Sequence, residues 1–176
     1  MKKVVLLTIL AALMMISSAA VAQTATGTLT VTATVQGSIG LVFNSDASGV
    51  ALASGAGTNT ATLALGNISA FGAIAAGIVR TTTATNFTVS SAVDVLVTKT
   101  NSASANYTLK AQLGSADAVN TWAVGGVAVT NAAQSTLTAT GTYAANSNFP
   151  VAITVPFTTA SGTLISNTIN YVATAN

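Results

Sequence analysis

The sequence predicts an all-β protein, an antiparallel β-sandwich of Ig-like or Greek-key topology with about eight to ten short strands. Three observations lead to this fold class. Val, Ile and Thr, which favour strands, are abundant along the chain. Short segments of alternating apolar and polar residues recur, and clusters of Gly, Ser and Asn separate them as turns do. Helical periodicity is almost absent, and no long or short repeat favours the alternative fold, a β-solenoid.

The N-terminus has the pattern of a secretory signal peptide over residues 1–22. Two lysines precede an uncharged apolar run over residues 4–16, and small residues follow up to Ala22. This run is shorter than the roughly 20 residues that span a bilayer, and the small residues suit signal peptidase. We therefore expect a single domain over residues 23–176, without a transmembrane helix, that is secreted, periplasmic or on the surface of a bacterial cell. A retained N-terminal membrane anchor is the alternative.

The first expected strand covers residues 24–35, where apolar and polar side chains alternate strictly. Such a period of two is typical of a half-buried strand. One face carries Leu29, Val31, Ala33 and Val35, and the other carries Thr28, Thr30, Thr32 and Thr34.

The stretch from residue 38 to residue 78 is less regular. We expect a strand over residues 38–43, a long loop over residues 44–59 and a short strand over residues 60–65 that ends at a Gly-Asn turn. Apolar residues three and four apart in residues 68–78 would allow a short helix, but two glycines disfavour it. An irregular loop or a short strand is our expectation there.

The rest of the chain carries clearer strand patterns. The expected strands cover residues 87–90, 93–99, 106–113, 122–130, 135–140, 151–157 and 163–175. Gly125 and Gly126 predict a tight turn or a bulge within one of them. Pro150 and Pro156 are expected near strand ends, where a missing N–H does least harm.

Charge and cysteine content narrow the classes of partner. Once the leader is removed, three basic residues balance three aspartates, and the mature chain has no net charge. Three scattered bases cannot form the basic patch that nucleic acid requires. An uncharged surface of Thr, Ser and Asn lacks the repulsion that keeps proteins apart, so it favours self-association. With no cysteine, stability must come from packing and hydrogen bonds.

Catalysis and cofactor binding are not expected. The chain has neither His nor Cys, so triads and zinc sites cannot form. Carboxylate chemistry would depend on Asp46, Asp94 and Asp117, which we interpret as turn or surface residues. The Asn and Ser near Asp46 lack the glutamate that ends an EF-hand loop, so no metal is predicted. The single tryptophan, Trp122, is expected in the core rather than in a sugar-binding surface.

Three segments resemble the pilin-like subunits of bacterial surfaces, such as the spore coat U family of chaperone-usher subunits. They are residues 28–35, residues 63–66 and residues 162–171. The cysteine pair common in that family is absent here. The resemblance implies a sandwich completed by a strand from a neighbouring subunit, with Leu29, Val31, Ala33 and Val35 entering the acceptor, and it implies a periplasmic chaperone as a partner. Residues 24–35 as the first strand of the chain's own sandwich remain the other interpretation.

We therefore expect an exported structural or adhesive surface protein, a fibre subunit that associates with itself or with other surface proteins. The alternative is a secreted module that binds carbohydrate or ice through Thr-rich strand faces, with Thr28, Thr30, Thr32 and Thr34 as its ligand face.

Overall fold

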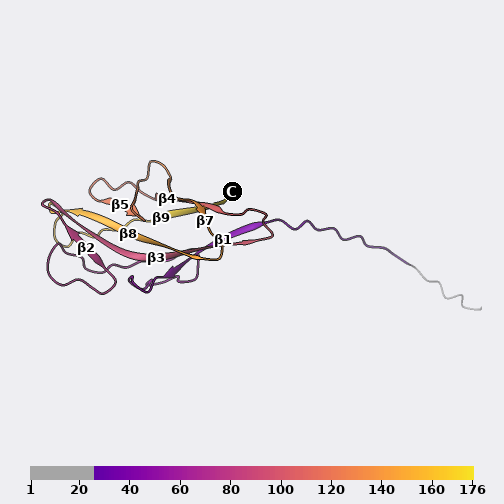
Figure 1. Ribbon diagram of the computed structural model, residues 1–176, viewed down its shortest axis with the longest axis horizontal. Helices are drawn as coiled ribbons and strands as arrows, with labels where there is room; N and C mark the ends of the chain where they lie inside the picture. The colour runs from indigo at the N-terminus through magenta and orange to yellow at the C-terminus, as the bar shows by residue number, and fades with distance from the viewer. Residues whose placement is uncertain (1–25) are drawn as a thin grey trace, which may run out of the picture. The chain divides into compact units, whose positions relative to one another are not determined.

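The computed structural model describes residues 26–176, and the predicted signal peptide lies outside them. Two units make up the chain, one ending at Thr34 and the other covering residues 35–176. In the first unit, residues 26–34 form no strand and are exposed. The second unit has strands β1 (Ser38–Ser45), β2 (Val79–Thr82), β3 (Asn86–Thr100), β4 (Tyr107–Leu113), β5 (Thr121–Val124), β6 (Val127–Val129), β7 (Ser135–Gly141), β8 (Asn146–Pro156) and β9 (Ile169–Ala175) (Figure 1).

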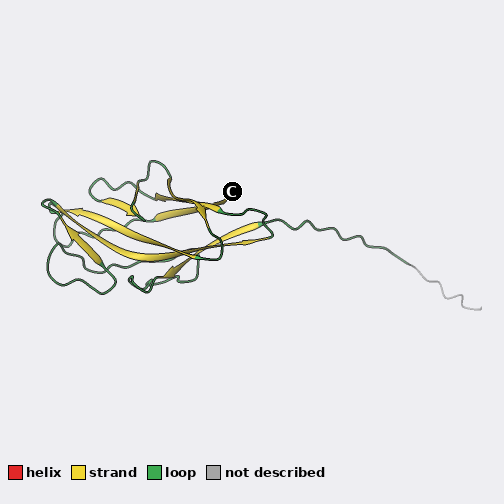
Figure 2. Ribbon diagram, in the orientation of Figure 1, coloured by secondary structure: helices red, strands yellow, loops and turns green. Residues whose placement is uncertain are grey.

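The predicted antiparallel β-sandwich is confirmed. One sheet has the strand order β1-β3-β8-β5-β6, with β2 paired to β3, and the other has the order β7-β4-β9. Every pairing is antiparallel, and Figure 2 shows strands and loops without helix in the described residues. An Ig domain has sheets A-B-E-D and C-F-G. The order β1-β3-β8-β5 matches the first, and β4-β9 matches C-F, so the described residues supply no strand in the position of G.

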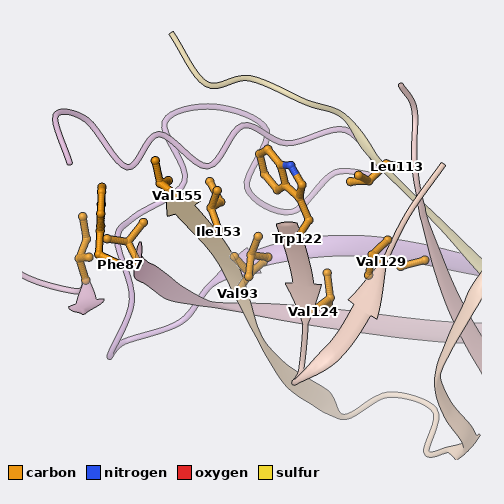
Figure 3. Close-up of a cluster of buried hydrophobic side chains, with 12 residues drawn as sticks. Phe87, Val93, Leu113, Trp122, Val124, Val129, Ile153 and Val155 are labelled. Carbon is orange, nitrogen blue, oxygen red and sulfur yellow. The ribbon is translucent and has the colours of Figure 1, made fainter. Parts of the chain in front are cut away.

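The core lies between the two sheets and follows the alternation of their strands. In β3, the side chains from Phe87 to Val97 alternate between buried and half-buried positions, as in β4 and the second half of β8. One cluster of buried side chains extends from Phe87 to Trp122 and Leu113 (Figure 3). A second cluster contains Val95, Val97, Tyr107 and Leu109. Trp122 is buried, as predicted.

Two long strands differ from their predicted bounds because of contacts that are remote in sequence. Residues 87–90 and 93–99 form one strand, β3, and the buried hydroxyl of Ser91 between them accepts the N–H of Val50 at 2.7 Å. Strand β8 begins before Pro150 rather than at it. The carbonyl of Pro150 accepts the N–H of Gly125 at 2.8 Å, so the missing N–H also faces that turn. The ladder with β3 therefore loses no hydrogen bond at Pro150.

One short strand outside the predicted set, β2, directly follows the irregular stretch. Residues 68–78 are a loop, as expected, and positive φ values at Gly72 and Gly77 interrupt any helix there. Residues 60–65 make only an isolated bridge between Ser54 and Thr62. The predicted turn at Gly125 and Gly126 joins β5 and β6, and both glycines have positive φ.

The last strand is shorter than predicted, because β9 begins at Ile169 rather than near residue 163. The side-chain oxygen of Asn167 accepts the N–H of Thr168 at 2.9 Å and that of Ser115 at 3.3 Å. Such bonds from an Asn side chain compete with a strand ladder and mark its start.

No helix in residues 26–176 is both long enough and apolar enough to cross a membrane.

Candidate strand-addition site

The alternating segment near the N-terminus forms no strand within the described residues. The structure assigns no strand to residues 26–37, although the sequence predicts a half-buried strand up to residue 35. Leu29 is 88% exposed, Val31 79% and Val35 75%. The strand β1 begins only at Ser38 and is the first strand in the order of the larger sheet, beside β3. A strand needs a hydrogen-bonded neighbour, so this segment gains strand structure only where such a neighbour is present.

The two faces predicted for this segment share the same exposed environment. Ala33 and the threonines Thr28, Thr30, Thr32 and Thr34 are exposed, as are the three large apolar residues. The alternation is therefore present in the sequence without a partner that would bury one face.

The edge of β9 opposite β4 is free of strand partners in the described residues. Strand β9 is the last strand of its sheet and pairs only with β4. The N–H of Asn176 donates to the carbonyl of Asn106 at 3.0 Å, and the N–H of Gly114 donates to that of Thr168 at 2.7 Å. Because hydrogen-bonded and non-hydrogen-bonded pairs alternate in an antiparallel ladder, even-numbered residues of β9 bond to β4.

The odd-numbered residues of β9 therefore direct their N–H and C=O groups to the free edge. They are Ile169, Tyr171, Ala173 and Ala175. Natural sheet edges are usually protected by charged residues, proline or bulges. The sequence of β9 has neither charge nor proline, and its pairing with β4 is in continuous register. This edge is open to an additional strand.

Side chains beside this edge are incompletely buried, in contrast to those of the central strands. Ile169, Tyr171 and Ala173 of β9 are half-buried, whereas Val95, Val97 and Leu109 are fully buried. On β1, Leu41 and Phe43 are also half-buried, and the rings of Phe43 and Tyr171 meet edge-on at 5.1 Å between centroids. An added strand would cover these half-buried side chains, which are Leu41, Phe43, Ile169, Tyr171 and Ala173. The core lacks cover on the side where an Ig domain has strand G.

Asp46 and Asp94 lie near the same Asn148 side chain, Asp117 lies in a separate loop, and all three act as local hydrogen-bond acceptors. Asp46 accepts the N–H of Ser48 at 2.8 Å, and hydrogen bonds from Ser48 lower the pKa of Asp46. Asp94 lies on β3 and accepts the side-chain amide of Asn148 at 3.3 Å. No group of three His, Cys, Asp or Glu residues that could hold a metal occurs within residues 26–176.

Asp117 organises the loop before Trp122. It accepts the backbone N–H groups of Val119 and Asn120 at 3.0 and 2.8 Å, and the indole N–H of Trp122 at 2.8 Å. Partial desolvation raises the pKa of Asp117, but these bonds outweigh it and lower the pKa to about 2. The carboxylate is occupied by the protein itself, and sequence analysis missed this role because the contact to Trp122 depends on the folded loop.

A shallow hollow of about 300 Å³ lies beside this loop. Asp117, Asn120, Thr159, Leu164 and Asn167 are among the residues that line it. The side-chain oxygens of Asn120 and Thr159 are buried without a hydrogen-bond partner. Because the Asp117 oxygens already accept several bonds, the hollow offers little for general acid-base chemistry.

Comparison of the chain with protein-family models, with curated proteins and with solved structures found no match.

Proposed function

We propose that the protein is an exported structural or adhesive subunit of a bacterial surface and that its copies join by strand addition. Residues 26–36 of one copy pair with the free edge of β9 in another. The observation that carries this proposal is that a single chain has both an unpaired alternating segment and an unprotected sheet edge beside an incompletely covered core. Strand addition of this kind takes affinity from backbone hydrogen bonds and specificity from alternate side chains.

Two terms would stabilise such pairing. The large apolar side chains of the segment, Leu29, Val31 and Val35, would be buried, and the N–H groups of Ile169, Tyr171, Ala173 and Ala175 would gain acceptors. The ordering of the segment opposes both terms. Neither residues 26–37 nor β9 carries a charge that would have to be desolvated.

The direction of β9 supports pairing between copies rather than within one. We call the end of the sandwich at the β3–β4 loop the Asn101 end, and the opposite end, where β8 finishes, the Phe157 end. Ile169 packs in the cluster of Phe87, and Ala173 packs in the cluster of Val97, so β9 runs toward the Asn101 end.

An antiparallel strand on β9 therefore finishes at the Phe157 end. Gly37 lies at the Asn101 end, because a Cβ added to it would be 2.7 Å from the Asn101 carbonyl oxygen. The chain's own segment would have to finish at that end and could pair with its own β9 only in parallel. A second copy has no such restriction.

Strand addition joins two different surfaces, and such heterologous contacts continue into filaments unless a ring closes. The principal partner is then a second copy of the chain. A periplasmic chaperone is a further proposed partner, because the β9 edge is exposed to premature pairing before assembly.

Negative-stain electron microscopy of the chain from Gln23 onward tests the proposal. We expect filaments that disappear when residues 23–36 are deleted. Circular dichroism of the deleted chain would show whether the β-sandwich is retained. Filaments that persist after the deletion, or an intact chain that stays monodisperse at high concentration with the sandwich folded, would contradict strand addition.

A second candidate function, binding of ice or carbohydrate, is favoured by one observation on the larger sheet. Four threonines form a row across neighbouring strands, because Thr81 is paired with Thr88, Thr88 with Thr154, and Thr154 with Thr121. Neighbouring strands are about 4.8 Å apart, so the row is regular. This row, and not the segment of Thr28, Thr30, Thr32 and Thr34, is the threonine surface that the sheet orders.

Substitution of the two exposed threonines of the row, Thr81→Lys and Thr121→Lys, tests this candidate. Ice shaping or binding to insoluble polysaccharide should be lost if the row is the ligand surface. Unchanged binding by both variants, or no binding by the parent chain, would contradict it.

A further inference from the structure

Three phenylalanines form a contact series from the core to the surface at the Phe157 end. Phe87 is buried, and its ring stacks on Phe157 at 6.3 Å between centroids. Phe157 in turn contacts Phe71 at 6.1 Å. Phe157 is 40% exposed and Phe71 is 73% exposed. Adjacent exposed aromatic rings are typical of a binding surface, because their burial yields a large gain.

The loop that carries Phe71 is held in place by β2. The guanidinium of Arg80 donates to the carbonyls of Ser69 and Gly72 at 2.9 and 2.7 Å. The hydroxyl of Thr82 donates to the carbonyl of Ala70 at 3.2 Å. The Phe71 backbone is thus fixed on both sides of the ring, and a preorganised group loses less entropy on binding.

The same end of the sandwich is where an added strand would finish. The N–H of Phe157 donates to the carbonyl of Thr85 at 2.9 Å, in the turn that precedes β3. Strand β2 pairs with the start of β3 on the side opposite β8, and β1 occupies the same side further along β3 (Figure 1). The Phe71 loop therefore lies on the side of the first sheet that carries β1, at the end toward which an antiparallel donor strand runs.

The length of the donor segment agrees with this position. Eleven residues in strand conformation, residues 26–36, extend about 36 Å, whereas the seven residues of β9 extend about 23 Å. A segment that starts beside Ala175 therefore passes beyond Ile169 toward the Phe157 end. In the donor copy, β1 begins at Ser38, only a few residues after the added segment. The Asn101 end of the donor copy must therefore lie close to the Phe157 end of the acceptor copy.

We infer that Phe71 and Phe157 form a second contact between successive copies, against the Asn101 end of the next copy. This contact rests on the proposed strand addition, since the direction of the added strand brings the two ends together. It adds a body-to-body contact to the strand contact and fixes the angle between neighbouring copies. The partner of the aromatic surface is a second copy of this chain.

Cysteine cross-linking in the full chain tests this contact, because the natural sequence has no cysteine. An Ala73→Cys/Ala103→Cys double variant keeps Phe71 and places one thiol beside it and one at the Asn101 end, and both alanines are exposed. Under oxidation we expect covalent ladders of several copies from the double variant and none from Ala103→Cys alone. Dimers from Ala73→Cys alone, without ladders from the double variant, would mean that the aromatic surfaces meet each other and would overturn the inference.

A serine series separates this contact from strand addition. Phe71→Ser and Phe157→Ser should each raise the concentration needed for filaments at least tenfold, while a peptide of residues 26–36 still protects the Tyr171 amide from exchange. Leu164→Ser is the control at the same end of the sandwich, because Leu164 is also apolar and 88% exposed but lines the hollow and is not part of the phenylalanine series. Unchanged filament assembly in both phenylalanine variants would refute the aromatic contact. If the peptide does not protect the Tyr171 amide of the parent chain, strand addition itself is refuted.

Discussion

The composition-preserving exchange Val31→Thr/Thr32→Val gives a sharp test of which face of the N-terminal segment enters the acceptor. Valine and threonine have nearly the same shape, and both favour strands. Val31 is 79% exposed in the free chain, and strand addition would bury it. Because side chains alternate across a strand, Thr32 would stay on the outer face.

The expected loss for Val31→Thr follows from one methyl group and one hydroxyl. Losing the burial of a methyl group costs about 0.8 kcal/mol, and burying a hydroxyl without a partner costs about 1–3 kcal/mol. The sum of roughly 2–4 kcal/mol corresponds to an association about 30-fold to 700-fold weaker. Thr32→Val alone should change the affinity less than threefold, because the outer face stays in water.

Fluorescence anisotropy of labelled peptides of residues 26–36 provides the measurement. The acceptor would be the full chain with Val31→Lys in its own segment, which prevents polymerisation. Val31→Thr and the double exchange should bind weakly, while Thr32→Val binds like the parent peptide. Equal affinity of the Val31→Thr and Thr32→Val peptides would refute the assignment of the apolar face to the acceptor.

Three other perturbations test the edge, the core and the Asp117 loop. Ala173→Pro removes an N–H that faces the free edge, so it should abolish filaments while circular dichroism stays unchanged, whereas Val172→Pro should unfold the domain by breaking the ladder with β4. Gly141→Ala should lower the free energy of unfolding in urea by about 1–3 kcal/mol, since the new Cβ would clash with the buried ring of Tyr107, and an unchanged midpoint would contradict this. Asp117 has a folded-state pKa of about 2, below its ordinary 3.8, so its contribution to the free energy of unfolding is full above about pH 4 and is lost as the pH falls toward 2. Asp117→Asn should therefore flatten the dependence of the free energy of unfolding on pH in this range. The same pH dependence in the variant and the parent chain would contradict the role of the carboxylate.

Local patterns predicted the fold class because the strands alternate strongly, as in β4 and the second half of β8. The predicted strand bounds were wrong where contacts with residues distant in sequence determine the extent of a strand. In the sequence, Ser91 indicates a break between two strands, but in the structure its buried hydroxyl accepts the N–H of Val50. Pro150 indicates the start of a strand, but its carbonyl accepts the N–H of Gly125 within the sheet. No local pattern distinguishes these two residues from ordinary turn residues.

The candidate site was predictable only in its donor half. The apolar face of Leu29, Val31, Ala33 and Val35 is visible in the sequence as a strict alternation. The acceptor half is not, because the free edge of β9 follows from the order of strands in the sheet. The contact series of Phe71, Phe157 and Phe87 joins residues far apart in sequence and likewise depends on the fold.

Amide hydrogen exchange at β9 tests strand addition most directly, because alternate residues of this one strand face opposite edges. The measurement uses the Val31→Lys chain with and without the parent peptide of residues 26–36. We expect the amides of Val172 and Thr174 to be protected in both states, and those of Tyr171 and Ala173 to become protected only with the peptide. Fast exchange of Tyr171 and Ala173 at saturating peptide would contradict strand addition at β9.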